Sequence, residues 1–136
     1  MSNIKNISLN TGKIRVNLTD EDGETMGVLS FVPSAVGFLE RYEEIQKYFE
    51  NRFGDEELTD EMTIDDIVKI SGEIKEKFDY LLDTSSDPIF AKCAPLTQLA
   101  DGSLYFVQVL DVIANLLVDV VDERSNKITE AVEKYS

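Results

Sequence analysis

The segment LYFVQVLDVIANLLVDVV, residues 104–121, is the longest apolar stretch of this 136-residue chain and decides how the chain folds. Its polar members recur at spacings of three or four residues: Gln108, Asp111, Asn115 and Asp119. In a helix this spacing puts them in one narrow line and leaves most of the circumference apolar. We therefore expect a long helix, capped by Ser103, that is either central to the domain or covered by another chain.

The charges of the chain restrict its partners. The segment 104–121 fails as a membrane span because two carboxylates and an Asn interrupt it. In the whole chain 27 Asp and Glu stand against 13 Lys and Arg, which gives a net charge of −14. Such a surface repels phosphate backbones and anionic lipid. We expect neither a nucleic acid nor a membrane as partner.

The residue types that are missing argue against catalysis. The chain has no His, which removes imidazole acid–base relays and the commonest zinc ligand. Its one cysteine, Cys93, cannot close an intramolecular disulfide, and we expect a buried structural thiol. The first residues show neither a basic nor an apolar targeting pattern, so a cytosolic protein is expected. We expect no enzymatic activity, no cofactor and no metal.

A β-hairpin is expected near the start of the chain. Residues 1–12 mix polar residues with a few Ile and Leu, too little apolar surface to order the segment firmly, and we expect a flexible arm. From Lys13 onward apolar and polar residues alternate, with Ile14, Val16 and Leu18 on one face, as in a half-buried strand. The stretch Thr19–Glu24 supplies turn residues, and a second strand follows at Val28–Phe31.

Two amphipathic helices are expected between the hairpin and residues 104–121. The first begins near Ala35 and ends before Gly54, with this apolar stripe: Val36, Leu39, Tyr42, Ile45, Phe49 and Phe53. The second begins at a capping box of Thr63 and Asp66 and has this stripe: Ile64, Ile67, Ile70, Ile74, Phe78 and Leu81. The sequence therefore predicts a mostly α member of the α+β class, an N-terminal β-hairpin followed by three main helices.

The domain organisation follows from these elements. Residues 83–103 form an irregular connection with a short helix from Asp87-Pro88, and residues 13–125 make a single α+β domain. A helix from Ser103 to Tyr135 would be about 48 Å long, whereas a compact globule of this size is about 37 Å across. The helix must break near Ser125-Asn126 or project, so residues 126–136 are predicted to be a C-terminal helical extension or tail.

Three groups of acidic residues are candidate sites. Asp20–Glu24 lacks the ligand spacing of a calcium loop and is expected to be a turn. Asp111 and Asp119 lie about 12 Å apart on one helix, too far for paired-carboxylate chemistry. The acidic run Asp55–Asp66 is expected to be solvated surface, with recognition of a basic partner and metal binding as the alternatives.

The order of elements and several short motifs resemble a known family. The motifs are Phe31-Val32-Pro33-Ser34, Phe78-Asp79-Tyr80-Leu81-Leu82-Asp83, Asp87-Pro88-Ile89-Phe90, Phe106 with Val109-Leu110, and Lys134-Tyr135. Over nearly its whole length the chain resembles the tail assembly chaperones of long-tailed bacteriophages of Gram-positive hosts. The resemblance implies self-association and binding of the tape measure protein in the host cell cytoplasm. It also implies absence from the mature virion and, in many members, a longer frameshifted form.

The protein-binding residues are predicted from apolar periodicity along the last helix and the tail: Val109, Val112, Leu116, Val120, Ile128, Val132 and Tyr135. A different class of function stays open, that of an acidic inhibitor or adaptor of the DNA-mimic type. It would dock a basic partner through Glu40, Glu43, Glu44, Asp55, Glu56, Glu57, Asp60 and Glu61. Salt separates the two functions, because charge-mediated binding weakens with ionic strength and apolar binding does not.

Overall fold

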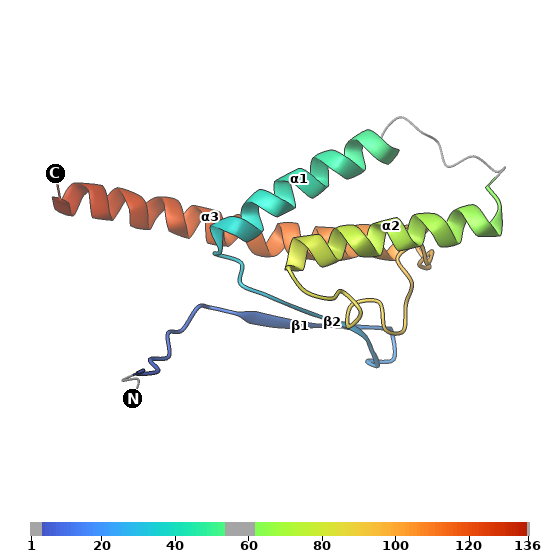
Figure 1. Cartoon of the computed structure of the whole chain (residues 1–136), viewed down its shortest axis with the longest axis horizontal. Helices are drawn as coiled ribbons and strands as arrows, with labels where there is room; N and C mark the ends of the chain where they lie inside the picture. The colour runs from blue at the N-terminus through green and yellow to red at the C-terminus, as the bar shows by residue number, and fades with distance from the viewer. Residues whose placement is uncertain (1–3, 54–61, 136) are drawn as a thin grey trace.

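A computed structural model describes residues 4–53 and 62–135 (Figure 1). The elements, in chain order, are β1 (Ile14–Thr19), β2 (Thr25–Phe31), α1 (Val36–Phe53), α2 (Ile64–Leu82) and α3 (Tyr105–Tyr135). The two strands pair antiparallel and precede the helices. The predicted α+β class, with an N-terminal hairpin and mostly helical content, is confirmed.

The hairpin turn is built around Asp20. Its Oδ1 accepts hydrogen bonds from the backbone amides of Asp22 and Glu24, at 2.9 and 3.0 Å. Gly23 has a φ of +80°, a conformation that glycine adopts without steric cost. The turn predicted at Thr19–Glu24 is therefore confirmed, and the second strand begins three residues earlier than expected.

Helix α1 packs against β2 through a residue that the predicted stripe omits. Phe38 is buried and its ring stacks on that of Phe31, with centroids 4.7 Å apart. Ile45 and Phe49 continue the buried face, as predicted, whereas Val36 is exposed. The stripe was wrong in its first turn because the contact with β2, and not helical periodicity alone, decides which side is covered. The expected end at Gly54 lies outside the described residues.

Helix α2 begins and ends at recognisable caps. The side chains of Thr63 and Asp66 each accept a hydrogen bond from the other's backbone amide at 3.2 Å, which confirms the predicted capping box. Asp83 closes the helix in the left-handed conformation. The buried stripe runs from Ile70 to Leu81, while Ile64 and Ile67 are exposed, so it starts later than predicted.

The core lies where the three helices meet. The Phe49 ring of α1 lies 6.4 Å from that of Phe78 on α2 and 5.3 Å from that of Phe106 on α3, centroid to centroid. Arg41 of α1 also donates from Nε to the backbone carbonyl of Leu81, at 3.0 Å. These contacts join all three helices around one set of aromatic rings.

The connection between α2 and α3 is irregular but anchored. The predicted short helix at Asp87-Pro88 is a turn, in which the amides of Ile89 and Phe90 donate back to Ser86. Ser86 is fully buried, and its hydroxyl donates to the carbonyl of Lys75 at 3.2 Å. Cys93 is buried in the same connection, as predicted.

Helix α3 runs without interruption from Tyr105 to Tyr135. At about 1.5 Å per residue its 31 residues span about 46 Å. It passes through Ser125-Asn126 unbroken and its C-terminal part extends away from the rest of the chain (Figure 1). The predicted cap is replaced, because the Ser103 hydroxyl donates to the Asp101 carboxylate and accepts from Gln108. None of the described helices combines the length and the apolarity needed to cross a bilayer.

Candidate protein-binding surface

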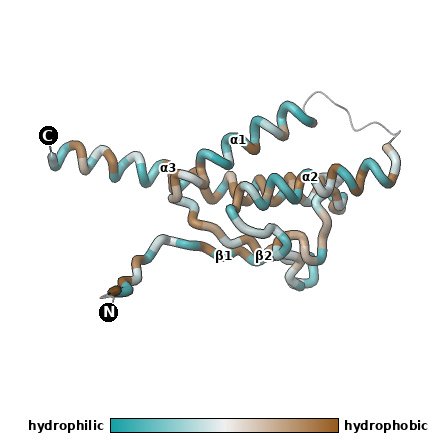
Figure 2. Tube along the Cα trace, viewed as in Figure 1, coloured by the Kyte–Doolittle hydropathy of each residue, from teal (hydrophilic) through white to brown (hydrophobic). Residues whose placement is uncertain are grey.

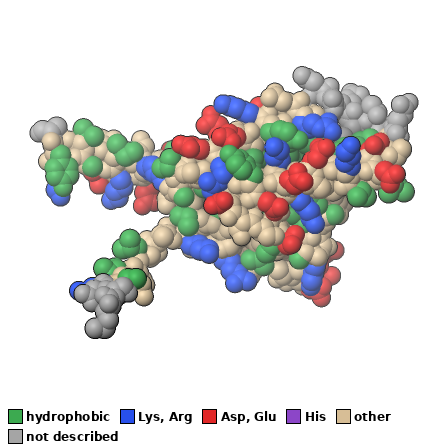
Figure 3. Space-filling model, viewed as in Figure 1, with side chains coloured by type: hydrophobic (Ala, Val, Ile, Leu, Met, Phe, Trp, Pro, Cys, Tyr) green, Lys and Arg blue, Asp and Glu red, His purple; other side chains and the backbone are tan. Residues whose placement is uncertain are grey.

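The outer half of α3 presents a row of exposed apolar side chains. They are between 49% and 80% exposed, and we call them the outer seam: Val118, Val121, Ile128, Val132 and Tyr135. When Ser125 is counted, their spacing alternates between three and four residues. This is the heptad spacing of helices that pack side by side. Figure 3 shows apolar side chains on the projecting part of the helix.

The outer seam continues the buried stripe of the same helix. Ile113 and Leu117 are buried in the core, and Val121 follows Leu117 by four residues, one helical turn. Apolar positions keep recurring along the helix after it leaves the domain, as the brown segments of Figure 2 show. One apolar stripe therefore serves the core over its first half and faces solvent over its second half.

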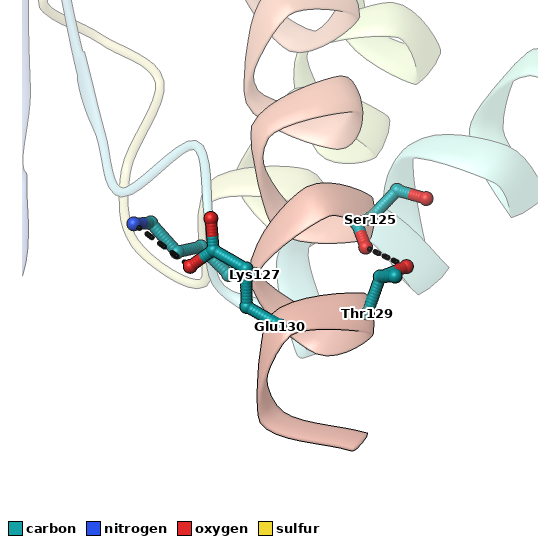
Figure 4. A network of polar contacts seen from close by, with 4 residues as sticks. All are labelled: Ser125, Lys127, Thr129 and Glu130. Atoms are coloured by element: carbon teal, nitrogen blue, oxygen red, sulfur yellow. Dashed lines mark hydrogen bonds and ion pairs between the residues drawn. The ribbon is translucent and has the colours of Figure 1, made fainter. Parts of the chain in front are cut away.

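Local contacts support the projecting part of α3. The Lys127 Nζ lies 3.4 Å from Oε2 of Glu130, and the Thr129 hydroxyl donates to the backbone carbonyl of Ser125 at 3.0 Å (Figure 4). The two charged side chains are about two-thirds exposed, and such surface ion pairs contribute well under 1 kcal/mol. Neither contact covers the outer seam.

The residues predicted to bind protein fall into two groups. Val109 is only 1% exposed, and Val112 and Leu116 are half-buried against the core, so these three residues fasten α3 to its own domain. Ile128 and Val132 lie on the outer seam together with Tyr135. The structure thus buries Val109 almost completely within its own chain.

Three further valines of α3 bear on the predicted binding surface: Val120, which was predicted, and Val118 and Val121, which were not. Val120 is half-buried and lines a shallow groove between the start of β1 and α3. Val118 and Val121 were not predicted, although counting back from Ile128 in steps of three and four reaches both. The predicted residues Val112 and Leu116 lie instead on the side of the helix that packs against the core.

A second concave surface lies at the turn end of the hairpin. Its volume is about 450 Å³, and it is bounded by the hairpin turn, residues 99–101 and α3. Apolar side chains of all three parts line it, namely Leu18, Met26, Leu99, Val109 and Val112. Asp20, Glu21 and Asp101 add carboxylates around it. We call it the hairpin-end groove.

Two of these carboxylates are held in fixed positions by their own turns. Asp101 Oδ1 accepts hydrogen bonds from both the hydroxyl and the amide of Ser103, and these bonds lower the pKa of Asp101. Asp20 is tied to the amides of Asp22 and Glu24. The groove therefore combines apolar lining with negative charges that keep their place.

The acidic surface of α1 is partly engaged within the chain. Glu43 pairs with Lys47 at 3.3 Å. Glu44 accepts a 2.6 Å hydrogen bond from the Tyr80 hydroxyl, and this bond raises the pKa of Tyr80. The other acids considered for a basic partner, apart from Glu40, lie in residues 55–61, outside the described residues. No observation on α1 therefore singles out a docking site.

Metal chemistry finds no support in the described ranges. Within residues 4–53 and 62–135, no three acidic or cysteine side chains are grouped closely enough to hold a metal ion. Most of the acidic run Asp55–Asp66 lies outside these ranges.

No protein family matches this sequence, and none of the curated proteins or solved structures compared with it is similar to it. A function must therefore be inferred from the surfaces themselves, namely the outer seam and the hairpin-end groove.

Proposed function

We propose that this chain is a non-catalytic tail assembly chaperone, which binds the tape measure protein of a long-tailed bacteriophage and keeps it soluble. It would act in the host cell cytoplasm, associate with copies of itself and be absent from the mature virion. The observation that carries the proposal is the outer seam, a heptad-spaced apolar row on a helix that extends beyond its domain.

The geometry of the outer seam favours a helical client. From Val118 to Tyr135 it runs for about 26 Å along the helix axis, enough to accept several turns of an amphipathic helix. Heptad spacing fits a partner helix lying alongside, whose apolar residues insert between those of the seam. The net charge of −14 would keep such a complex from aggregating.

The experiment is co-purification with helical fragments of a phage tape measure protein. The variant Ile128→Ser/Val132→Ser should reduce retention of the fragment at least about ten-fold, because both apolar contacts are lost. The matched control, Asp119→Ser/Asn126→Ser, changes exposed residues on the opposite side of the same helix and should retain the fragment. Equal retention by both variants contradicts the proposal.

The acidic adaptor function is separated by the same assay at increasing salt. The Debye length falls from about 10 Å at 0.1 M to about 3 Å at 1 M, so charge-mediated docking weakens while apolar contacts persist. Retention that disappears at high salt and depends on Glu40 and Glu43, but not on Ile128 and Val132, would favour the adaptor.

A further inference from the structure

The N-terminal arm, residues 4–13, holds three large apolar side chains that its own chain leaves uncovered. Ile4, Ile7 and Leu9 are 78%, 81% and 82% exposed. Figure 3 shows apolar side chains along this arm, which hangs clear of the domain. An extended segment that exposes three aliphatic residues has apolar surface to bury against a partner.

The arm also differs from the rest of the chain in charge. The arm carries Lys5 and Lys13 and no acid, whereas all 27 acidic residues follow it in the sequence. The segment is thus apolar and basic, attached to a strongly acidic domain. Opposite charges steer such a segment toward an acidic surface and fix its register there.

The hairpin-end groove is complementary to the arm in both respects. Its apolar lining, with Met26 and Val112, suits the aliphatic side chains, and Asp20, Glu21 and Asp101 suit the lysines. We propose that the N-terminal arm of one copy lies in the hairpin-end groove of a second copy. This inference rests on the self-association proposed above and names the segments that meet.

The groove that receives the arm belongs to another copy because of where the arm starts. The arm joins β1 at Ile14, whereas the groove lies at the other end of this strand, beside Leu18 and Thr19. The two ends of β1 are about 17 Å apart, because a strand rises about 3.3 Å per residue. From Ile14 the arm continues away from the groove (Figure 1). The arm and groove of one copy therefore point in opposite directions.

The consequence is head-to-tail association. Each copy would offer an arm at one end and a groove at the other, so that the contact is between two different surfaces. Such contacts form rings when the rotation closes and open chains when it does not. The size of the assembly should then grow with concentration or stop at one ring number.

The test is sedimentation velocity on the full chain over a range of concentrations. The variant Ile7→Ser/Leu9→Ser removes two arm contacts and should raise the dissociation constant at least about ten-fold. Its control, Asn6→Ser/Ser8→Ala, alters neighbouring polar positions and should sediment like the parent chain.

A charge exchange tests the partner surface. Lys5→Glu and Glu21→Lys should each weaken association about three-fold, and the chain carrying both changes should recover, because each copy then offers a reversed arm to a reversed groove. If Glu21 had only a structural role, association would not recover in the double variant.

Three outcomes would overturn the inference. The parent chain could be a monomer at every concentration, which would show that the arm does not lie in the groove of a second copy. The arm variants could associate like the parent chain. Association could instead be lost only in Ile128→Ser/Val132→Ser, which would assign it to the outer seam. Retention of the tape measure fragment by the arm variants, measured in parallel, keeps this inference separate from the chaperone function.

Discussion

The hydroxyl of Tyr105 donates a 2.8 Å hydrogen bond to the backbone carbonyl oxygen of Ile89. Tyr105 is the first residue of α3, and Ile89 belongs to the connection that follows α2. The neighbouring Pro88 carbonyl accepts from the amide of Val28 in β2, at 3.0 Å. This short stretch of connection thus fastens the hairpin to the start of the long helix.

We expect Tyr105→Phe to lower the free energy of unfolding by about 1–2 kcal/mol, because the buried carbonyl of Ile89 loses its donor. Urea denaturation followed by circular dichroism measures the change. Tyr135→Phe is the control, since this tyrosine is 80% exposed and its change should have no effect. Equal stability of Tyr105→Phe and the parent chain would show that water replaces the hydroxyl.

The same hydroxyl gives a prediction for alkaline pH. Burial, with Cys93 nearby, raises the pKa of Tyr105 to about 12 from its ordinary value near 10. Between these values the unfolded chain has released the proton and the folded chain still holds it, so the contribution to stability decreases as pH rises. The stability advantage of the parent chain over Tyr105→Phe should shrink from about pH 10 and, because a raise of two pKa units corresponds to about 2.7 kcal/mol, vanish or change sign by about pH 12. A constant difference would contradict the raised pKa.

Two glycines should respond in opposite directions to alanine. A Cβ on Gly27 would collide with the backbone carbonyl of Ile89 and lie 2.6 Å from the Tyr105 hydroxyl, so Gly27→Ala should cost about 3 kcal/mol or more. Gly72 lies in α2 with open space around it, and Gly72→Ala should stabilise the chain by about 0.5–1 kcal/mol. Melting temperatures of the two variants should move apart, and a shared direction would mean that this packing is wrong.

Removal of residues 126–136 should leave the domain folded. The last buried residue of α3 is Leu117, and the side chains from Asn126 to Tyr135 are exposed. The near-ultraviolet spectrum and the melting temperature should stay close to those of the full chain, while retention of the tape measure fragment falls. Loss of cooperative unfolding would instead place the extension in the core.

The sequence predicted those elements whose causes are local. The alternation of apolar and polar residues over Ile14–Leu18 is by itself enough to predict a strand. The pair Thr63 and Asp66 is likewise enough to predict a helix cap. Phe38 and Ser86 could not be placed this way. Phe38 is buried because Phe31 lies opposite, and Ser86 because the carbonyl of Lys75 and the carboxylate of Asp79 meet it.

The candidate surface was predicted in part for the same reason. Apolar periodicity marked Ile128, Val132 and Tyr135, which the domain leaves exposed. It marked Val109 equally, because an apolar residue on a helix looks the same in sequence whether its own domain or a partner covers it. Only the position of the hairpin and of residues 99–101 distinguishes the two cases.

The unbroken helix α3 has two halves that should exchange their amide hydrogens with solvent by different routes. From Tyr105 to Leu117 the backbone is held by the core, so exchange requires global unfolding. Beyond Val121 the helix has no buried side chain among the described residues and is supported by local contacts such as that between Thr129 and Ser125, and a short helix without packing frays readily. Deuterium uptake should therefore rise steeply after Val121 in the free chain, and a partner lying along the outer seam would move this boundary toward Tyr135.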